Sequence, residues 1–106
     1  MKIIDLSDIQ SSSRLIMAVD YAVASARYGG ESLVKFITRS KYASRHLRHT
    51  LYKWKKQNKV NFIISGERYH LGNMETQYML NLYPEEGNDA DIGAANPLIT
   101  VTYIYS

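Results

Sequence analysis

The sequence predicts an α+β fold in which three helices are followed by strands. Up to Asn58, apolar residues recur at the spacing of about 3.6 that marks a helix. After Asn58 the spacing falls to about two, as in a half-buried strand. Residues 98–105 carry no charge and are rich in β-branched and aromatic types. A chain of 106 residues, 45% of them hydrophobic, is expected to form one domain over its whole length, 1–106.

The first predicted helix covers about residues 14–28. Serines at positions 11–13 can accept free backbone N–H groups at its start, and Gly29-Gly30 can end it in a left-handed conformation. Its apolar stripe consists of Leu15, Ile16, Val19, Ala22, Val23 and Ala26.

The second and third predicted helices are joined by a turn of about three residues. The second covers 31–39, and its apolar stripe is Leu33, Phe36 and Ile37. The third covers about 43–58 and places Leu47, Leu51 and Trp54 on one stripe. Two helices with a short turn between them have the layout of a helix-turn-helix unit.

The remaining chain is expected to form a β-hairpin over about 60–83, closed by a two-residue turn at Gly72-Asn73. An acidic, turn-rich loop at 84–97 follows, expected to be exposed and mobile. The last predicted element is a C-terminal strand at 98–105.

Basic residues are concentrated in one block. Nine of the thirteen Lys and Arg residues lie between Lys35 and Lys59, and no Asp or Glu occurs between Ser32 and Gly66. An ordinary solvated helix alternates Glu with Lys at four-residue spacing, and this one does not. The unpaired charges indicate an external anion, against the simpler interpretation of a solvated face.

Three helices followed by a hairpin resemble the winged helix-turn-helix domain of prokaryotic, phage or plasmid transcription regulators. The residues that carry the resemblance run from Glu31 to Leu71. The resemblance implies a sequence-specific double-stranded DNA-binding regulator that acts as a homodimer, with a recognition helix in the major groove and a wing on the backbone.

Candidate DNA contacts follow from the basic helix and the expected wing. Arg45, Arg48 and His49 are the candidates for base edges, because Arg is the best reader of guanine. Lysines 41, 53 and 56 are the candidates for phosphates, together with Arg68. The full set of candidate DNA-binding residues is Lys41, Ser44, Arg45, Arg48, His49, Tyr52, Lys53, Lys56 and Arg68.

Other chemistry is not expected. The chain has no cysteine, which excludes disulfides and thiolate metal sites. His46 and His49 lack a third metal ligand nearby, and no phosphate-binding glycine loop is present, so we expect neither an enzyme nor a cofactor. No apolar run reaches the ~20 residues that span a bilayer, and a cytoplasmic location is expected.

Two alternatives for function stay open. The basic helix could dock on an acidic partner protein, as in a small phage- or plasmid-encoded inhibitor. RNA binding is a lesser alternative, because the aromatic residues do not gather on one predicted strand.

For a homodimer, the strand 98–105 is the preferred interface and the first helix the second choice. The strand could instead complete a sheet within one chain.

Overall fold

A computed structural model describes residues 1–30 and 33–105 and has an α+β fold with a four-stranded mixed sheet. The strand order is β1-β2-β4-β3; β1 and β2 run parallel, and β4 is antiparallel to both of its neighbours. The elements in chain order are β1 Lys2–Asp5, α1 Ser12–Gly29, β2 Leu33–Ile37, α2 Lys41–Lys56, β3 Val60–Ser65, the 3-10 helix η1 Gly66–Arg68, α3 Met74–Leu82, the 3-10 helix η2 Pro84–Asn88 and β4 Ile99–Ile104.

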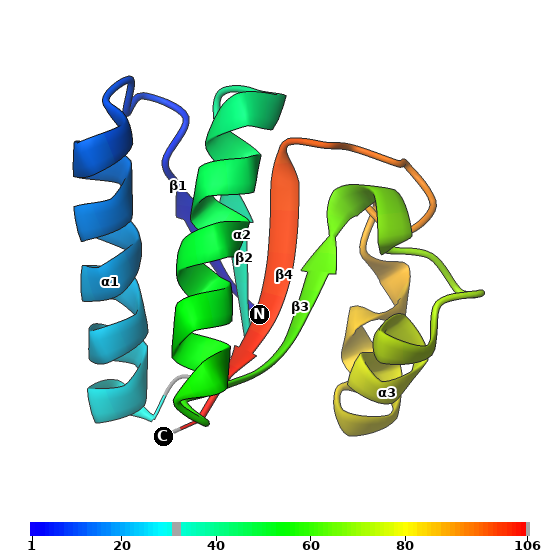
Figure 1. Cartoon of the computed structure of the whole chain (residues 1–106). Coiled ribbons are helices and arrows are strands. Elements are labelled where there is room, and N and C mark those ends of the chain that lie inside the picture. The colour runs from blue at the N-terminus through cyan, green and yellow to red at the C-terminus, as the bar shows by residue number, and fades with distance from the viewer. Residues whose placement is uncertain (31–32, 106) are drawn as a thin grey trace.

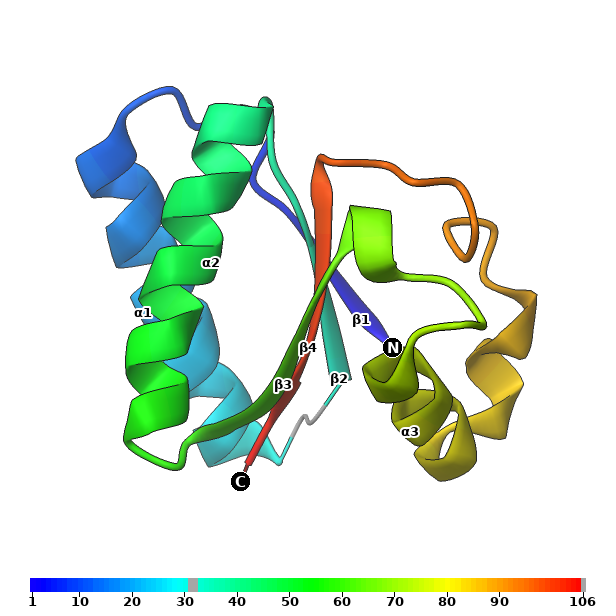
Figure 2. The same cartoon turned by 45° about the vertical axis from the view of Figure 1, so that its right-hand side comes forward.

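The sheet separates two layers of helix. Helices α1 and α2 lie side by side over one face, and α3 and η2 lie over the other, as the turned view shows with the sheet between them (Figures 1 and 2). Each face has its own cluster of buried apolar side chains. On the first face Leu47, Leu51 and Val23 are fully buried, and on the second Tyr69 and Met79 are.

Helix α1 confirms the first predicted helix. The Ser11 hydroxyl accepts a hydrogen bond from the Arg14 N–H at its start, and Gly30 ends it with a φ of 77°. Leu15, Val19 and Val23 face the sheet, as their spacing predicts.

The prediction of a helix at 31–39 is wrong, because residues 33–37 form strand β2; residues 31 and 32 lie outside the described part of the chain. Strand β2 lies between β1 and β4, so Leu33, Val34, Lys35 and Phe36 are all buried. A strand buried on both faces carries a continuous apolar run, and a run this short also fits helical spacing.

The predicted hairpin at about 60–83 is half wrong. Its first strand is confirmed as β3, but the second half forms η1 and helix α3. The Asn73 side chain accepts hydrogen bonds from the N–H and the hydroxyl of Thr76 and caps α3, so Gly72-Asn73 starts a helix instead of closing a hairpin. The described residues therefore contain no wing.

The predicted C-terminal strand is confirmed as β4, and it completes the sheet within one chain. Because β2 and β3 pair with its two edges, β4 has no free edge for the homodimer contact that we preferred. Two of the elements that carried the winged helix-turn-helix resemblance, the helix at 31–39 and the second strand of the wing, are therefore absent from the described fold, whereas the basic helix and the first strand are present.

Candidate nucleic-acid interface

Helix α2 corresponds to the predicted basic helix and begins two residues earlier. The Ser40 hydroxyl accepts a hydrogen bond of 3.1 Å from the Ala43 N–H and caps the first turn. Leu47 and Leu51 are completely buried against the sheet and α1, which fixes the opposite face toward solvent. Asn58, with a φ of 60°, lies just after the end of the helix.

The solvent side of α2 carries most of the predicted DNA contacts. Their positions repeat at intervals of three and four residues, which places them on one face of the helix. We call this the outer face of α2: Lys41, Arg45, His49, Tyr52, Lys53 and Lys56, all exposed. A shallow hollow of about 300 Å³ lies beside it, lined by Tyr42, Arg45, His46 and His49.

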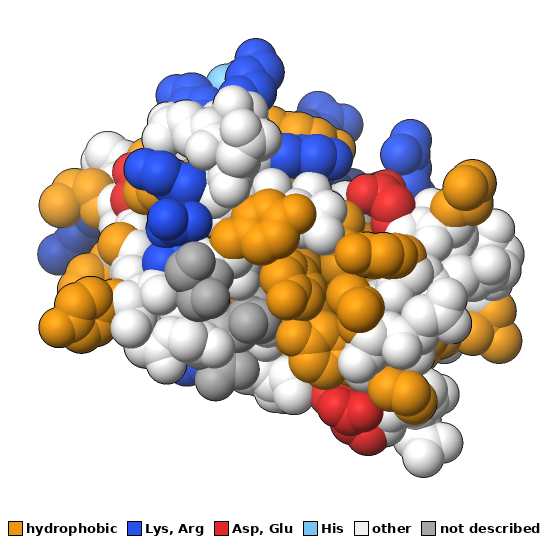
Figure 3. All heavy atoms as spheres, turned by 90° about the horizontal axis from the view of Figure 1, so that it is seen from below, with side chains coloured by type: hydrophobic (Ala, Val, Ile, Leu, Met, Phe, Trp, Pro, Cys, Tyr) orange, Lys and Arg blue, Asp and Glu red, His pale blue; other side chains and the backbone are white. Residues whose placement is uncertain are grey.

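No acid in the described ranges forms an ion pair with the outer face. Among the described residues the ion pairs involve the N-terminal amine, Lys35 and Arg48, and none involves Lys41, Arg45, Lys53 or Lys56. Lys and Arg side chains gather along one border of the molecule in the view from below (Figure 3). Four cations on one helix face repel each other, and an anionic ligand removes that repulsion.

The N-terminal end of α2 adds to this positive field. The first turn contains no acidic residue and begins with Lys41, and the exposed Arg39 lies just before the cap. The backbone N–H groups at a helix N-terminus carry a partial positive charge that usually attracts acidic side chains. Here cations occupy those positions, an arrangement that favours an anion from outside the chain.

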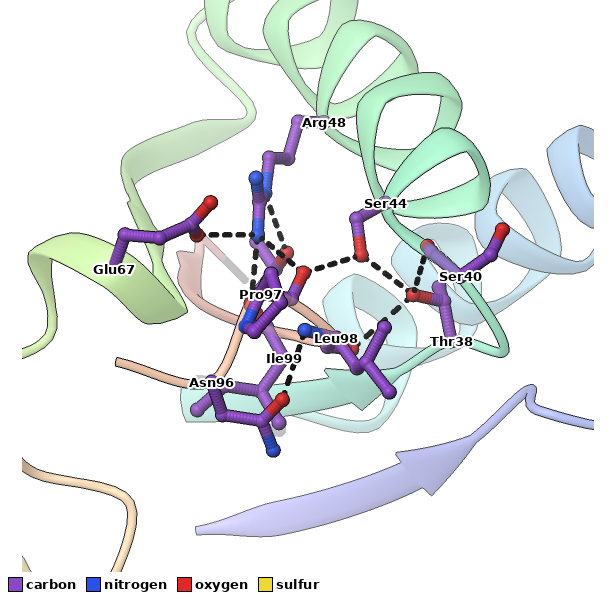
Figure 4. Close-up of polar contacts among 10 residues, drawn as sticks. Thr38, Ser40, Ser44, Arg48, Glu67, Asn96, Pro97, Leu98 and Ile99 are labelled. Carbon is purple, nitrogen blue, oxygen red and sulfur yellow. Dashed lines mark hydrogen bonds and ion pairs between the residues drawn. The ribbon is translucent and has the colours of Figure 1, made fainter. Parts of the chain in front are cut away.

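Two predicted contacts, Ser44 and Arg48, point into the molecule instead (Figure 4). The buried Ser44 hydroxyl lies 2.6 Å from the Thr38 hydroxyl and donates a 2.8 Å hydrogen bond to the Pro97 carbonyl. Arg48 donates through Nη2 to the carbonyls of Pro97 and Ile99, at 3.1 and 3.0 Å. These two side chains therefore hold the segment that enters β4.

Arg48 has further partners at the same place. Its Nε donates to the Thr100 hydroxyl at 3.0 Å, and its Nη2 lies 3.4 Å from the Glu67 carboxylate. Burial lowers the pKa of Arg48, and the charge of Glu67 opposes that shift. With Nε and Nη2 bonded inside the protein, Arg48 is not part of the outer face.

Arg68, the predicted wing contact, lies on η1 and is exposed. Because η1 follows β3, Arg68 projects from a different element from the outer face of α2. The Arg68 carbonyl accepts a hydrogen bond from the Thr76 hydroxyl, which connects η1 to α3.

The acidic segment on the other side of the sheet is largely exposed, as predicted, but its Asp89 and Asp91 side chains are bound to the fold. Lys35 Nζ lies 2.6 Å from Asp89 Oδ2 and 2.7 Å from Asp91 Oδ2. The Tyr69 hydroxyl donates a 2.8 Å hydrogen bond to Asp89. We call these four residues the Lys35 cluster, and Lys35 itself is 4% exposed.

The charged forms of the Lys35 cluster stabilise each other. Burial lowers the pKa of Lys35, but hydrogen bonds to Asp89 and Asp91 outweigh it and raise the pKa. Burial raises the pKa of Asp89, but hydrogen bonds from Lys35, the Asp91 N–H and Tyr69 outweigh it and lower the pKa. Burial, and then the bond to Asp89, raise the pKa of Tyr69. Every charge here has a partner inside the protein.

Neither a metal centre nor a membrane span stands out. Within residues 1–30 and 33–105, no group of three or more His, Asp or Glu side chains could hold a metal ion. No helix in the described ranges combines the length and the hydropathy required to cross a bilayer.

No family model, curated protein or solved structure matches the chain. We therefore infer function from the outer face of α2.

Proposed function

We propose that the protein binds double-stranded nucleic acid, with DNA as the expected ligand, through the outer face of α2. The observation that carries the proposal is the set of four exposed cations, Lys41, Arg45, Lys53 and Lys56, which have no acidic partner among residues 1–30 and 33–105. The 16 residues of α2 extend over about 24 Å. Duplex DNA carries one negative charge per about 1.7 Å of its axis, so this length faces many phosphates.

Phosphate contacts are expected to dominate. One side of α2 packs on the sheet and another packs against α1, so the helix lies flat and offers only its outer face. Arg45 and His49 remain the candidates for base edges, and Tyr52 can stack or reach a phosphate. Phosphate contacts give affinity, and any sequence preference depends on these three side chains.

Transcription regulation by a homodimer extends the proposal. A single small module buries about 600–1,000 Å² against DNA, which rarely gives tight specific binding, so two copies on two half-sites are expected. With both edges of β4 paired inside the chain, our second choice of interface, helix α1, becomes the preferred one. Exposed apolar side chains on that helix, Met17 and Tyr21, support this choice.

Fluorescence anisotropy with a labelled 20-base-pair duplex at low salt tests the proposal. Arg45→Glu with Lys53→Glu is expected to weaken binding at least tenfold, because two attractive contacts become repulsive. The matched control is Arg14→Glu with Lys2→Glu, which makes the same charge change at exposed positions on α1 and β1. Equal losses from both double variants would mean that net charge alone drives binding and would contradict the proposal.

An acidic protein could occupy the same face. A pull-down from native lysate, with and without nuclease, distinguishes the two ligands. Partners lost after nuclease treatment support the nucleic acid, and a stoichiometric protein that survives it supports the alternative.

A further inference from the structure

A groove lies between the C-terminal end of α2, strand β3 and helix α3. Its volume is about 360 Å³, within the range of about 300–1,000 Å³ that small-molecule sites have. The lining residues are Lys55, Asn61, Phe62, Met74, Glu75 and Tyr78. None of these residues belongs to the outer face of α2, so the groove is a separate surface feature.

An aromatic platform forms one part of the groove. The Phe62 ring is buried and contacts the Tyr78 ring edge to face, with ring centroids 6.1 Å apart. Tyr103 extends the cluster at 5.9 Å from Phe62. Phe62 fixes the Tyr78 ring from one side, and 47% of Tyr78 stays exposed. Tyr78 therefore presents a preorganised ring to a ligand.

This cluster changes one interpretation made from the sequence. Aromatic residues do not gather on one predicted strand, which counted against stacking of unpaired bases. The fold brings aromatic rings together from β3, β4 and α3. Stacking of a base on an aromatic side chain needs only one accessible ring face.

The polar side chains of the groove match a nucleotide. Asn61 can donate and accept hydrogen bonds, and the Glu75 carboxylate accepts them. Glu75 repels a phosphate but attracts a base edge that carries N–H groups, as guanine does. Lys55 supplies one positive charge at the rim, where a single phosphate can bind.

Lys55 also connects the groove to the outer face of α2. Its Nζ lies 5.9 Å from the centre of the Tyr52 ring, and Tyr52 belongs to the outer face. Lys55 thus lies beside both the outer face of α2 and the groove.

We propose that the groove binds one unpaired nucleotide of the nucleic acid held on α2. The base stacks on Tyr78, its N–H edge meets Glu75 and Asn61, and its phosphate lies at Lys55. This inference rests on the proposed function, and it specifies the ligand further as a duplex with an adjoining single strand.

Three duplexes of the same sequence test the inference in anisotropy titrations with the full chain. One is blunt, one has a three-nucleotide guanine overhang, and one has an abasic overhang of the same length, which supplies the phosphates without the bases. The guanine overhang is expected to bind about tenfold more tightly than the abasic one, the size of the gain from one stacked base.

Three variants locate the effect. Tyr78→Ala is expected to remove the difference between guanine and abasic overhangs and to keep the affinity for the blunt duplex. Tyr78→Phe keeps the ring and is expected to preserve the difference, which separates stacking from a general loss of folding. Glu75→Gln is expected to reduce the gain in part, because the amide offers one acceptor in place of two.

The outcomes separate the two proposals. Equal affinities of the wild-type protein for guanine and abasic overhangs overturn the groove and leave duplex binding intact. A guanine gain that survives Tyr78→Ala also overturns it, because the base then binds elsewhere. A wild-type protein that binds none of the three duplexes contradicts the proposed function, and the groove inference fails with it.

Discussion

The two faces of the sheet treat charge in opposite ways. Over one face, α2 directs Lys41, Arg45, Lys53 and Lys56 into solvent with no ion-pair partner in the described part of the chain. Over the other face, the acidic segment folds back so that Asp89 and Asp91 bind the buried Lys35. Asp89 and Asp91 are thus committed to a lysine inside the fold.

This difference separates charges that maintain the fold from charges available to a ligand. Removing a charge from the Lys35 cluster leaves buried groups without a partner and costs folding free energy. Removing a charge from the outer face of α2 costs little, because solvated cations there contribute little to stability. Variants on the two faces should therefore affect different measurements.

The largest expected effect is the loss of stability in Lys35→Met. The change removes the cation that pairs with both carboxylates. Asp89 is only 10% exposed and loses most from this, whereas Asp91, 30% exposed, stays partly solvated. The free energy of unfolding should fall by about 3 kcal/mol, measured by urea denaturation. Lys53→Met is the matched control and should change it by less than about 0.5 kcal/mol. Similar losses in both variants would refute the contrast between the faces.

Arg48→Met should cost about 2 kcal/mol of stability, because the carbonyl of Ile99 and the hydroxyl of Thr100 lose a charged donor. Duplex affinity should change much less than in Lys53→Met, since Arg48 points inward. A variant that folds normally but loses most of its duplex affinity would mean that Arg48 does contact the nucleic acid.

Acid should weaken the fold through Asp89. Its pKa is lower in the folded protein than the usual value of about 3.9, so the unfolded chain binds more protons at low pH. The contribution of Asp89 is complete above about pH 5, where the unfolded carboxyl is also ionised, and is lost as the pH falls through the folded pKa. Urea midpoints between pH 2 and 6 should decline less steeply in Asp89→Asn, and an unchanged slope would exclude this role.

The smallest expected change in stability comes from Lys56→Ala, within about 0.5 kcal/mol of the wild type. Its effect should lie in binding, where one lost phosphate contact lowers the magnitude of the salt slope by about one. A matched Lys2→Ala variant, altered on β1, should keep the wild-type slope.

Helices α1 and α2 and strands β3 and β4 were predictable, because each is amphipathic or strongly β-forming over its length. Strand β2 was not, since Leu33, Phe36 and Ile37 satisfy helical spacing by chance. A signal was present at α3: Asn73 precedes Met74 and Glu75, and an asparagine before helix-forming residues is a common N-cap. The β-forming tyrosines and the Gly-Asn pair favoured the hairpin instead.

The candidate site divides in the same way. Exposure of Lys41, Arg45 and Lys53 follows from their position opposite Leu47 and Leu51, so helical periodicity alone places them. The inward turn of Arg48 depends on carbonyls 49 and 51 residues away, and burial of Lys35 depends on acids 54 and 56 residues away. Contacts at such separations exist only after the sheet has formed.

The salt dependence of duplex binding tests the central claim most directly. With Lys41, Lys53 and Lys56 on phosphates, the logarithm of the association constant should fall against the logarithm of salt concentration with a slope of about −3. Lys41→Ala with Lys53→Ala should reduce the magnitude of the slope by about two. A slope near zero, or one that the double variant leaves unchanged, would contradict a phosphate-binding role for the outer face of α2.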